Sequence, residues 1–533
     1  MVRSLVVGSG PAAAGAVMAL AADPAQQITV IDIGHRLEPA QQSAVTRLAS
    51  RSPSAWDQVD VELIRAQPIG DTIRRLPQKR VFGSDFPFRN VGQLDGVRGI
   101  GQANDFVISG AYGGFSNVWG SQIMVFTPAA FGQWPISFNE METHYKAVLD
   151  EMPYAAEEDA LARHFPLVSN ARPLPQLAPR TRAVLDAADR HQRELDQLGV
   201  VIGRARLAFD STACVRCGLC MTGCPYSLIY SSAHTFDKLR QSGRVDYHKD
   251  LLAVEVGQED DVPYVVARQL SNQTVHRFEA DRVYVACGAL GTTRLVLGSL
   301  HLFDQDVELA ESVQFALPML SRHPTPDPKL DTEFTLNQFN MVVSTDEEWR
   351  DVSQIHFYPH NPAILDGLPK VLGRPWAASV TDQLIRRLTI GLGYLPSWVS
   401  PTLRVRAKRP LGPSELPNLS LYGDVAHGLR IPMFREVMRR ILRAAPHLDL
   451  WPVLPMMFFS GSGKSYHFGG SFPHSDAPAD GPLTTDRLGR MEKWSRIHLI
   501  DASVFPTVPA TTFTLTAMAN AHRIAAETQG LGE

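Results

Sequence analysis

Four of the five cysteines in the 533-residue chain lie within eleven positions, in the segment STACVRCGLCMTGCPYSLIYSS at residues 211–232. They follow the spacing C-x2-C-x2-C-x3-C, with a proline directly after the last one, and are Cys214, Cys217, Cys220 and Cys224. Bacterial ferredoxins use this spacing to hold iron–sulfur clusters, because close turns between the cysteines let several thiolates converge on one cluster. The segment therefore predicts a 4Fe-4S cluster, or a 3Fe-4S cluster held by three of the thiolates.

The ligand set and the metal stay open from the spacing alone. In two-cluster ferredoxins the fourth cysteine of such a run binds the second cluster, and this chain has no second run. Cys224 can return to the same cluster as its fourth ligand, or Cys287 can supply a distant fourth ligand. The other interpretation of Cys287 is an ordinary buried small residue that binds no metal. Zinc and redox-active thiols are the alternatives, although zinc sites usually show two separated C-x2-C pairs. A reducing compartment argues against disulfides.

The first residues carry the pattern of a dinucleotide-binding unit. A short apolar strand, Leu5 to Val7, leads into Gly8 and Gly10, and Ala13 stands where the third glycine of the fingerprint is usual. A helix of small residues and a second strand follow, and this strand ends in Asp32. Glycines at the turn let the backbone approach a pyrophosphate, and the acid suits a ribose hydroxyl. The segment predicts an FAD or NAD site.

Composition frames these sites without adding another. The chain is 44% hydrophobic and 20% charged with a net charge of −4, which is ordinary for a globular protein and gives no electrostatic case for nucleic acid or acidic membranes. We identify no basic-then-apolar leader and no apolar stretch long enough for a membrane span. We therefore expect a cytoplasmic protein with at most peripheral membrane contact.

Further segments resemble a known family. They are YGGFSNVWGSQ (112–122), VYVACGALGTTRLVLGS (283–299) and the C-terminal stretch from GRMEKWSRIHLIDASVFP onward. Together with the N-terminal unit, and in this order, they resemble the glucose–methanol–choline (GMC) oxidoreductases, which are FAD-dependent alcohol oxidases and dehydrogenases. The resemblance favours FAD over NAD as the cofactor.

The resemblance implies an α/β fold with a discontinuous Rossmann-like FAD-binding domain and a second, α+β domain whose sheet roofs the flavin. We expect the FAD-binding domain over residues 1–300, with the iron–sulfur insertion at 211–232, and its return over 456–533. The substrate domain takes residues 301–455. Besides the N-terminal glycines, the resemblance implies these FAD-contacting residues: Gly113, Gly114, Ser116, Asn117, Gly288, Asp501 and Ala502.

The family's catalytic histidine corresponds to His467, in the glycine-rich segment SGSGKSYHFGGSF. A histidine beside a flavin can take the hydroxyl proton of an alcohol at neutral pH. His474 is a second, weaker candidate for this role. The family usually places another His or Asn before the last helix, whereas this chain has Thr512, which can hydrogen-bond a substrate oxygen but is no base at neutral pH. The departure leaves His467 to act alone.

These features predict an FAD-dependent dehydrogenase that oxidises an alcohol group of a sugar, glycoside or polyol. A two-electron flavin beside a one-electron cluster favours electron export to an acceptor protein or quinone over direct use of oxygen. Two alternatives stay open: an oxidase or lyase of the same family with a structural metal at the cysteines, and a non-enzymatic redox sensor or electron-transfer module.

Overall fold

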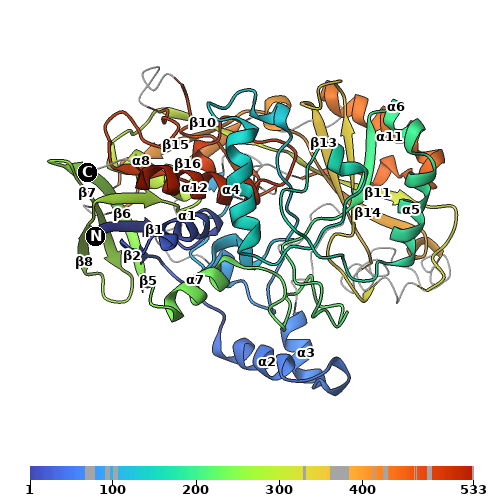
Figure 1. Ribbon diagram of the computed structural model, residues 1–533, viewed down its shortest axis with the longest axis horizontal. Coiled ribbons are helices and arrows are strands. Elements are labelled where there is room, and N and C mark those ends of the chain that lie inside the picture. The colour runs from blue at the N-terminus through green and yellow to red at the C-terminus, as the bar shows by residue number, and fades with distance from the viewer. Residues whose placement is uncertain are drawn as a thin grey trace.

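The computed structural model describes residues 1–66, 79–89, 97–99, 106–327, 332–360, 383–410, 412, 415–423, 430–460, 463, 465–476 and 483–530. Two sheets stand at opposite ends of the molecule, a parallel one beside both termini and a large antiparallel one, with helix α4 (Phe138–Asp150) crossing the space between them in Figure 1. Ser137 and Glu140 form a capping box that begins α4. The α/β fold class predicted from the sequence is confirmed.

The parallel sheet has the strand order β20-β9-β1-β2-β5. Its strands are β1 (Val2–Val7), β2 (Gln26–Ile31), β5 (Val245–His248), β9 (Arg282–Val285) and β20 (Ile497–Leu499). Helices α1 (Pro11–Ala22) and α12 (Thr514–Gln529) pack so closely that a Cβ at Gly15 would lie only 2.1 Å from the Met518 carbonyl oxygen. The first and last segments of the chain thus build one unit.

Smaller elements complete this end of the molecule. An antiparallel sheet contains β6 (Leu251–Glu259), β7 (Val262–Gln269) and β8 (Val275–Glu279). A mixed sheet with the order β19-β10-β15-β16-β3 contains β3 (Val97–Gly99), β10 (Asp306–Glu311), β15 (Leu403–Lys408), β16 (Asn418–Gly423) and β19 (Phe468–Gly469). The helices here are α7 (Ser232–Gln241) and α8 (Ala289–Ser299).

The large antiparallel sheet has the order β17-β11-β14-β13-β12-β4, with β18 beside β11. Its strands are β4 (Val200–Arg204), β11 (Gln314–Leu320), β12 (Phe339–Ser344), β13 (Val352–Tyr358), β14 (Leu388–Tyr394), β17 (Trp451–Pro452) and β18 (Phe458–Phe459). β4 precedes the cysteine run in the sequence and still pairs with β12, so the chain enters this sheet before residue 301.

Alternate residues of this sheet face opposite ways, as strand geometry requires. One face is apolar and packs with α5 (Pro179–Arg190), α6 (Gln192–Gln197) and α11 (Pro432–Leu448) in one hydrophobic core. The other face is largely buried too, but it carries polar and aromatic side chains, namely the buried Gln314, Asn340, Gln354, His356 and Tyr394 and the partly exposed Tyr358. A buried polar sheet face is unusual unless something binds there.

Helices α2 (Pro39–Ala49) and α3 (Gln58–Arg65) form a hairpin that projects from the body at the bottom of Figure 1. The hairpin shares a small apolar core with the cysteine loop, in which Leu48 and Ile64 lie with Leu219 and the partly buried Cys217. This projection therefore covers one side of the predicted cluster site.

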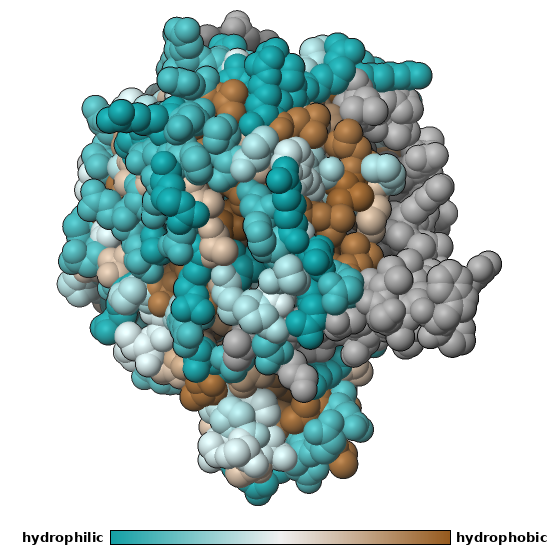
Figure 2. Space-filling view, turned by 90° about the vertical axis from the view of Figure 1, so that its right-hand side faces the viewer, coloured by the Kyte–Doolittle hydropathy of each residue, from teal (hydrophilic) through white to brown (hydrophobic). Residues whose placement is uncertain are grey.

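The face of the molecule in Figure 2 is mostly hydrophilic. Figure 2 looks onto the right-hand end of Figure 1 and shows a band of hydrophobic residues there, beside residues drawn in grey. On described elements of the large antiparallel domain, the exposed large apolar side chains include Leu442, Leu454 and Met456. Within the described ranges, no helix combines the length and apolar character needed to cross a membrane.

Candidate functional site

The turn between β1 and α1 forms a cradle of backbone groups. Gly8 has a φ of 103°, and a Cβ there would lie 2.6 Å from the Ala286 carbonyl oxygen, so no other residue fits without displacement. Gly10 caps α1, and a Cβ on it would meet nothing within 4 Å. Ala13 is fully buried in the first turns of the helix. The helix N-terminus thus opens onto free space, which suits an anionic group such as a pyrophosphate.

Asp32 ends β2 beside this cradle. Its carboxylate accepts hydrogen bonds from the Ser9 hydroxyl and, over 2.9 Å, from the Tyr247 hydroxyl. Burial raises the pKa of the Asp32 carboxyl to about 6, although both hydroxyls oppose the shift. The two donors fix the orientation of the carboxylate and leave lone pairs for a further hydroxyl, such as that of a ribose.

The predicted flavin loop lies directly against the cradle. A Cβ at Gly114 would come within 3.2 Å of the Gly10 Cα, and the Gly113 N–H donates to the Ser9 hydroxyl over 3.0 Å. Gly113 and Gly114 both have positive φ, 90° and 56°. Ser116 and Asn117 bond within the loop, to the carbonyl oxygens of Gly113 at 2.5 Å and of Gly114 at 2.7 Å. In this structure these two side chains hold the loop in shape.

The C-terminal turn closes the cradle from the other side. Asp501 accepts from the Thr292 hydroxyl at 2.5 Å and from the Ser503 N–H at 2.9 Å, which ties the turn to the start of α8. Gly288, just before α8, has a φ of 76°, and a Cβ there would meet nothing within 4 Å. The carbonyl of Ala502 accepts from the Gly470 N–H at 2.9 Å. The turn is thereby fixed to the segment that carries His467.

His467 lies half-buried between aromatic rings. Its imidazole stacks on Tyr394 with centroids 4.5 Å apart, and the ring of Phe513 lies nearly perpendicular to it with the centroids 5.1 Å apart. Nδ1 is buried and has no hydrogen-bond partner within the part of the chain that the structure describes. Burial lowers the pKa of His467 to about 4, so the ring is neutral at pH 7 and able to accept a proton.

Thr512 directly precedes Phe513 and is 7% exposed. Its Oγ1 is also buried and without a partner among the described residues. Phe513 contacts the His467 ring, so the structure brings both predicted catalytic residues to the same place. Each of them presents an unsatisfied polar atom, which native structures seldom leave inside a protein without a ligand or water.

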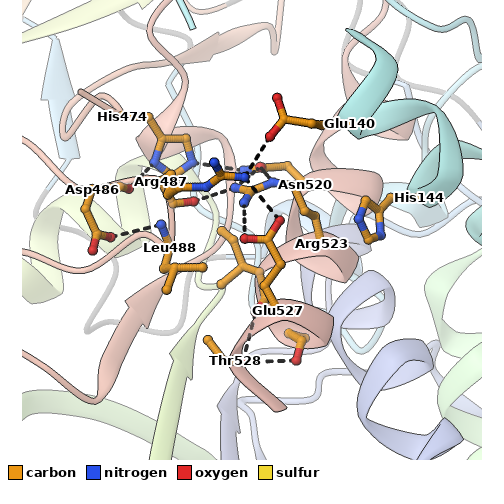
Figure 3. Close-up of polar contacts among 12 residues, drawn as sticks. Glu140, His144, His474, Asp486, Arg487, Leu488, Asn520, Arg523, Glu527 and Thr528 are labelled. Carbon is orange, nitrogen blue, oxygen red and sulfur yellow. Dashed lines mark hydrogen bonds and ion pairs between the residues drawn. The ribbon is translucent and has the colours of Figure 1, made fainter. Parts of the chain in front are cut away.

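His474, the second histidine candidate, is fully engaged elsewhere. Its Nδ1 lies 2.6 Å from the Asp486 carbonyl oxygen and its Nε2 lies 3.2 Å from the Asn520 amide nitrogen. Figure 3 shows these contacts as part of a network with the buried Arg523 and with Glu527 on α12. With both ring nitrogens bonded, His474 positions the chain and has no nitrogen left for a substrate.

Sequence reasoning missed Glu311, which anchors the loop of His467. Its carboxylate accepts from the Gly463 N–H at 2.6 Å and from the Ser465 hydroxyl at 3.0 Å, and Ser465 in turn accepts from the His467 N–H at 3.1 Å. Burial raises the pKa of Glu311 to about 7. No local pattern marks this residue, because its partners lie about 150 positions away in the chain.

The four clustered cysteines are free thiols in a partly buried loop. Burial raises the pKa of Cys214 to about 11 and that of Cys217 to about 12, and the neighbouring cysteines add to both shifts, so the sulfurs lie close to one another. The Arg216 N–H points at the Cys214 sulfur over 3.4 Å. Among the described residues, no three His, Cys, Asp or Glu side chains meet closely enough to hold one metal ion.

The fifth cysteine, Cys287, lies apart from the other four. Its sulfur is 3.9 Å from the Val7 carbonyl oxygen, and the charges of Asp501 and Asp32 act on it. Cys287 therefore belongs to the wall of the nucleotide cradle. Its partly buried position there favours its interpretation as an ordinary small residue of the wall.

Lys79 links the two predicted sites. Its ammonium donates to the Trp119 carbonyl oxygen in the flavin loop over 3.0 Å. Burial lowers its pKa to about 8, and the nearby Cys220 opposes the shift. The loop of Cys220 and the predicted flavin loop are thus bridged by a single cationic side chain.

Comparison with known proteins supports the fold. No family model matches the sequence, and no curated protein matches it. Many solved structures resemble the chain, and two of them do so at a TM-score of 0.60 each. Pyridoxine 4-oxidase from Mesorbium loti is 14% identical, with all of both chains covered. An FAD-dependent oxidoreductase from Chaetomium thermophilum, in complex with a fragment, is 11% identical, with 99% of both chains covered. The chain therefore has the fold of these two proteins over its whole length.

Proposed function

We propose that this protein is an FAD-dependent dehydrogenase of the GMC type. In this proposal it oxidises an alcohol group of a sugar, glycoside or polyol to a carbonyl and exports the electrons through an iron–sulfur cluster to an acceptor protein or quinone. The observation that carries the proposal is the neutral, half-buried imidazole of His467, whose buried Nδ1 has no partner within the described residues. One structure with the same fold is named an FAD-dependent oxidoreductase, and the other is named an oxidase of pyridoxine.

The cradle fits FAD. Gly8, Gly10 and the N-terminus of α1 would hold the pyrophosphate, and Asp32 would accept from the ribose. Space beside Gly10 and Gly288 is open, since a Cβ at either position would touch nothing within 4 Å. FAD, when bound, supplies the acceptor for a hydride from the alcohol carbon.

Within this site, His467 takes the hydroxyl proton of the substrate. The neutral ring has one nitrogen free to accept, and the flanking aromatic rings of Tyr394 and Phe513 hold it in place. Thr512 donates to or accepts from the substrate oxygen without changing its own charge. Because burial keeps the imidazole neutral, the base is ready at pH 7.

The cysteine loop suits an iron–sulfur cluster better than zinc. Zinc sites usually show two separated C-x2-C pairs, whereas this chain has a single C-x2-C-x2-C-x3-C run. A cluster binds its thiolates on several metal ions, and the Arg216 N–H that points at the Cys214 sulfur opposes the rise in the Cys214 pKa that burial causes. A cluster, when bound, passes electrons singly to an acceptor.

The test is made on anaerobically purified protein. Visible and EPR spectra, with iron, sulfide and FAD contents, are recorded before and after addition of sugars, polyols and simple alcohols. We expect bleached flavin together with a reduced-cluster signal. FAD with zinc and no sulfide would contradict the cluster and leave an oxidase or lyase. A cluster without bleaching by any alcohol would instead identify a redox module.

A further inference from the structure

The polar face of the large antiparallel sheet is built by cross-strand neighbours. Asn340 on β12 pairs directly with His356 on β13, and Gln354 on β13 pairs directly with Tyr394 on β14. Asn340 and Gln354 are 0% exposed and His356 is 2% exposed. Side chains on one face of adjacent strands at this spacing lie close enough to contact one ligand together.

The polar groups on this face lack protein partners. Oδ1 of Asn340, Oε1 of Gln354 and Nε2 of His356 are all buried without a hydrogen bond in the described chain. The two amide nitrogens approach only the sulfur of Met124, at 3.9 Å and 2.9 Å, and a thioether is a weak acceptor. In a buried amide, both the oxygen and the nitrogen normally have hydrogen-bond partners. This arrangement therefore points to a ligand with several hydroxyl groups.

This face lies beside the proposed base. Tyr394 contacts His356 on one side, with ring centroids 5.3 Å apart, and His467 on the other, at 4.5 Å. A molecule whose reacting hydroxyl meets His467 can therefore place its remaining hydroxyls against the sheet.

We propose that Asn340, Gln354 and His356 form a hydroxyl-binding subsite that selects a polyhydroxylated ring over a simple alcohol. The inference rests on the proposed function for the position of the reacting carbon. Each amide offers an oxygen that accepts and an N–H group that donates, which is what a hydroxyl of a sugar ring pairs with. An apolar alcohol would leave these groups unpaired and be rejected for that reason.

The test uses the near-isosteric variants Asn340→Leu and Gln354→Met in the holoenzyme. Methyl glucopyranoside and glucitol are the polyhydroxylated probes, and cyclohexanol is the monohydroxyl probe. For the polyhydroxylated probes we expect kcat/KM of anaerobic flavin bleaching to fall at least tenfold, with cyclohexanol unchanged or improved. The melting temperature should be equal or higher, because a buried unsatisfied amide has been replaced by an apolar group.

Ser353→Ala is the matched control. Ser353 lies on the same strand but the opposite face, and its hydroxyl donates to the Tyr394 carbonyl oxygen over 2.8 Å. This variant should lower the melting temperature and leave the selectivity unchanged. The proposal is overturned if Asn340→Leu and Gln354→Met leave selectivity unchanged, whether they lower the melting temperature or weaken FAD binding instead.

Failure of the proposed function would be seen separately. Calorimetric binding of methyl glucopyranoside, without any electron acceptor, reports the subsite whether or not the alcohol is oxidised. Binding by the wild type that is weakened at least tenfold in both variants supports the subsite even when no flavin bleaching occurs. Absence of binding to the wild type together with bleaching by cyclohexanol alone would overturn the subsite and retain the oxidation.

Discussion

The imidazole of His467 stacks on the ring of Tyr394, with centroids 4.5 Å apart and planes inclined by 22°. Tyr394 is itself fixed, because the Gln314 amide donates to its hydroxyl over 2.9 Å. The orientation of the proposed base thus depends on ring packing, since its Nδ1 bonds to no described residue. This arrangement leaves the nitrogen free and still immobilises the ring.

Tyr394 is therefore expected to act as a positioning residue. Tyr394→Leu removes the stacked ring and should lower kcat about tenfold, because a base held less firmly spends less time in line with the substrate. Tyr394→Phe keeps the ring and should retain near wild-type kcat. Stopped-flow bleaching of the flavin measures both. A large loss in Tyr394→Phe would instead assign the hydroxyl a direct role.

The low pKa of His467 predicts the acid limb of the pH–rate profile, that is, the pH range in which the rate falls as the solution becomes more acidic. The imidazole is neutral well above pH 4 and gains a proton as the pH falls through about 4, so proton abstraction is lost on the acid side. The rate of anaerobic flavin bleaching, measured after a rapid jump to each pH, should be constant from pH 8 to about 5 and fall below that.

His467→Asn should lower this rate by about 10²- to 10⁴-fold and abolish the acid limb. The control is His301→Asn, an exposed position with a φ of 55° that asparagine tolerates. A wild-type limb near pH 6.5 would mean that the imidazole is solvated in the working enzyme.

The nucleotide cradle gives a test that separates folding from binding. Gly10→Ala adds a Cβ that meets no protein atom within 4 Å, at a φ of −71° that alanine adopts readily. The apoprotein should keep its melting temperature while the FAD dissociation constant rises at least tenfold. Gly530→Ala, at the C-terminal end of α12, is the control and should change neither. Unchanged FAD affinity in Gly10→Ala would place the cofactor elsewhere.

Local patterns made part of this site predictable. Gly8, Gly10 and Asp32 belong to one strand–turn–helix–strand unit, whose spacing follows from backbone geometry over about thirty residues. His467 and Thr512 needed a resemblance to a known family, because a histidine among glycines has no chemical signature of its own. The cysteine spacing was equally local, and the proposed cluster stays a prediction.

The sheet face was not predictable in the same way. Polar residues alternate along the segment VSQIHFY, which contains Gln354 and His356, and this alternation does indicate a strand. The same alternation describes a strand with one face in water. Only the pairing of β13 with β12 and β14, and the burial of Asn340, Gln354 and His356, distinguish an internal site from a surface.

The buried carboxyl of Glu311 is expected to make the stability of the protein depend on pH in the opposite sense to an ion-paired carboxyl at the surface. Burial raises its folded-state pKa to about 7, above the ordinary 4.5, so the folded protein holds this proton more tightly than the unfolded chain. The contribution of this proton to the free energy of unfolding is fully present below pH 4.5 and is lost as the pH rises through 7. The total loss is on the order of 3 kcal/mol.

Glu311→Gln removes this dependence. Relative to the wild type, its free energy of unfolding should therefore rise between pH 5 and pH 8, as measured by denaturant titration at each pH. Glu308→Gln changes an exposed residue of the same strand, β10, and should show no such trend. Parallel pH profiles for Glu311→Gln and wild type would mean that the carboxyl is solvated or paired with a cation.

Replacing single cysteines tests the cluster and its ligands. Cys214→Ser, Cys217→Ser and Cys220→Ser should each remove most of the iron and sulfide while FAD content stays near that of the wild type, since the cradle lies elsewhere. Flavin bleaching by the alcohol should continue, but reduction of an external one-electron acceptor should fall at least tenfold, because the route from flavin to surface is broken.

Cys224→Ser separates the two predicted cluster types by EPR, because a three-iron cluster would survive it and a four-iron cluster would not. Cys287→Ser is the matched control for loss of a partly buried thiol. Its sulfur lies beside Val7 in the nucleotide cradle, so iron content should be unchanged. This ligand set would be overturned if Cys287→Ser lost its iron while Cys224→Ser retained it. Cys287 would then be the fourth ligand of the cluster in place of Cys224.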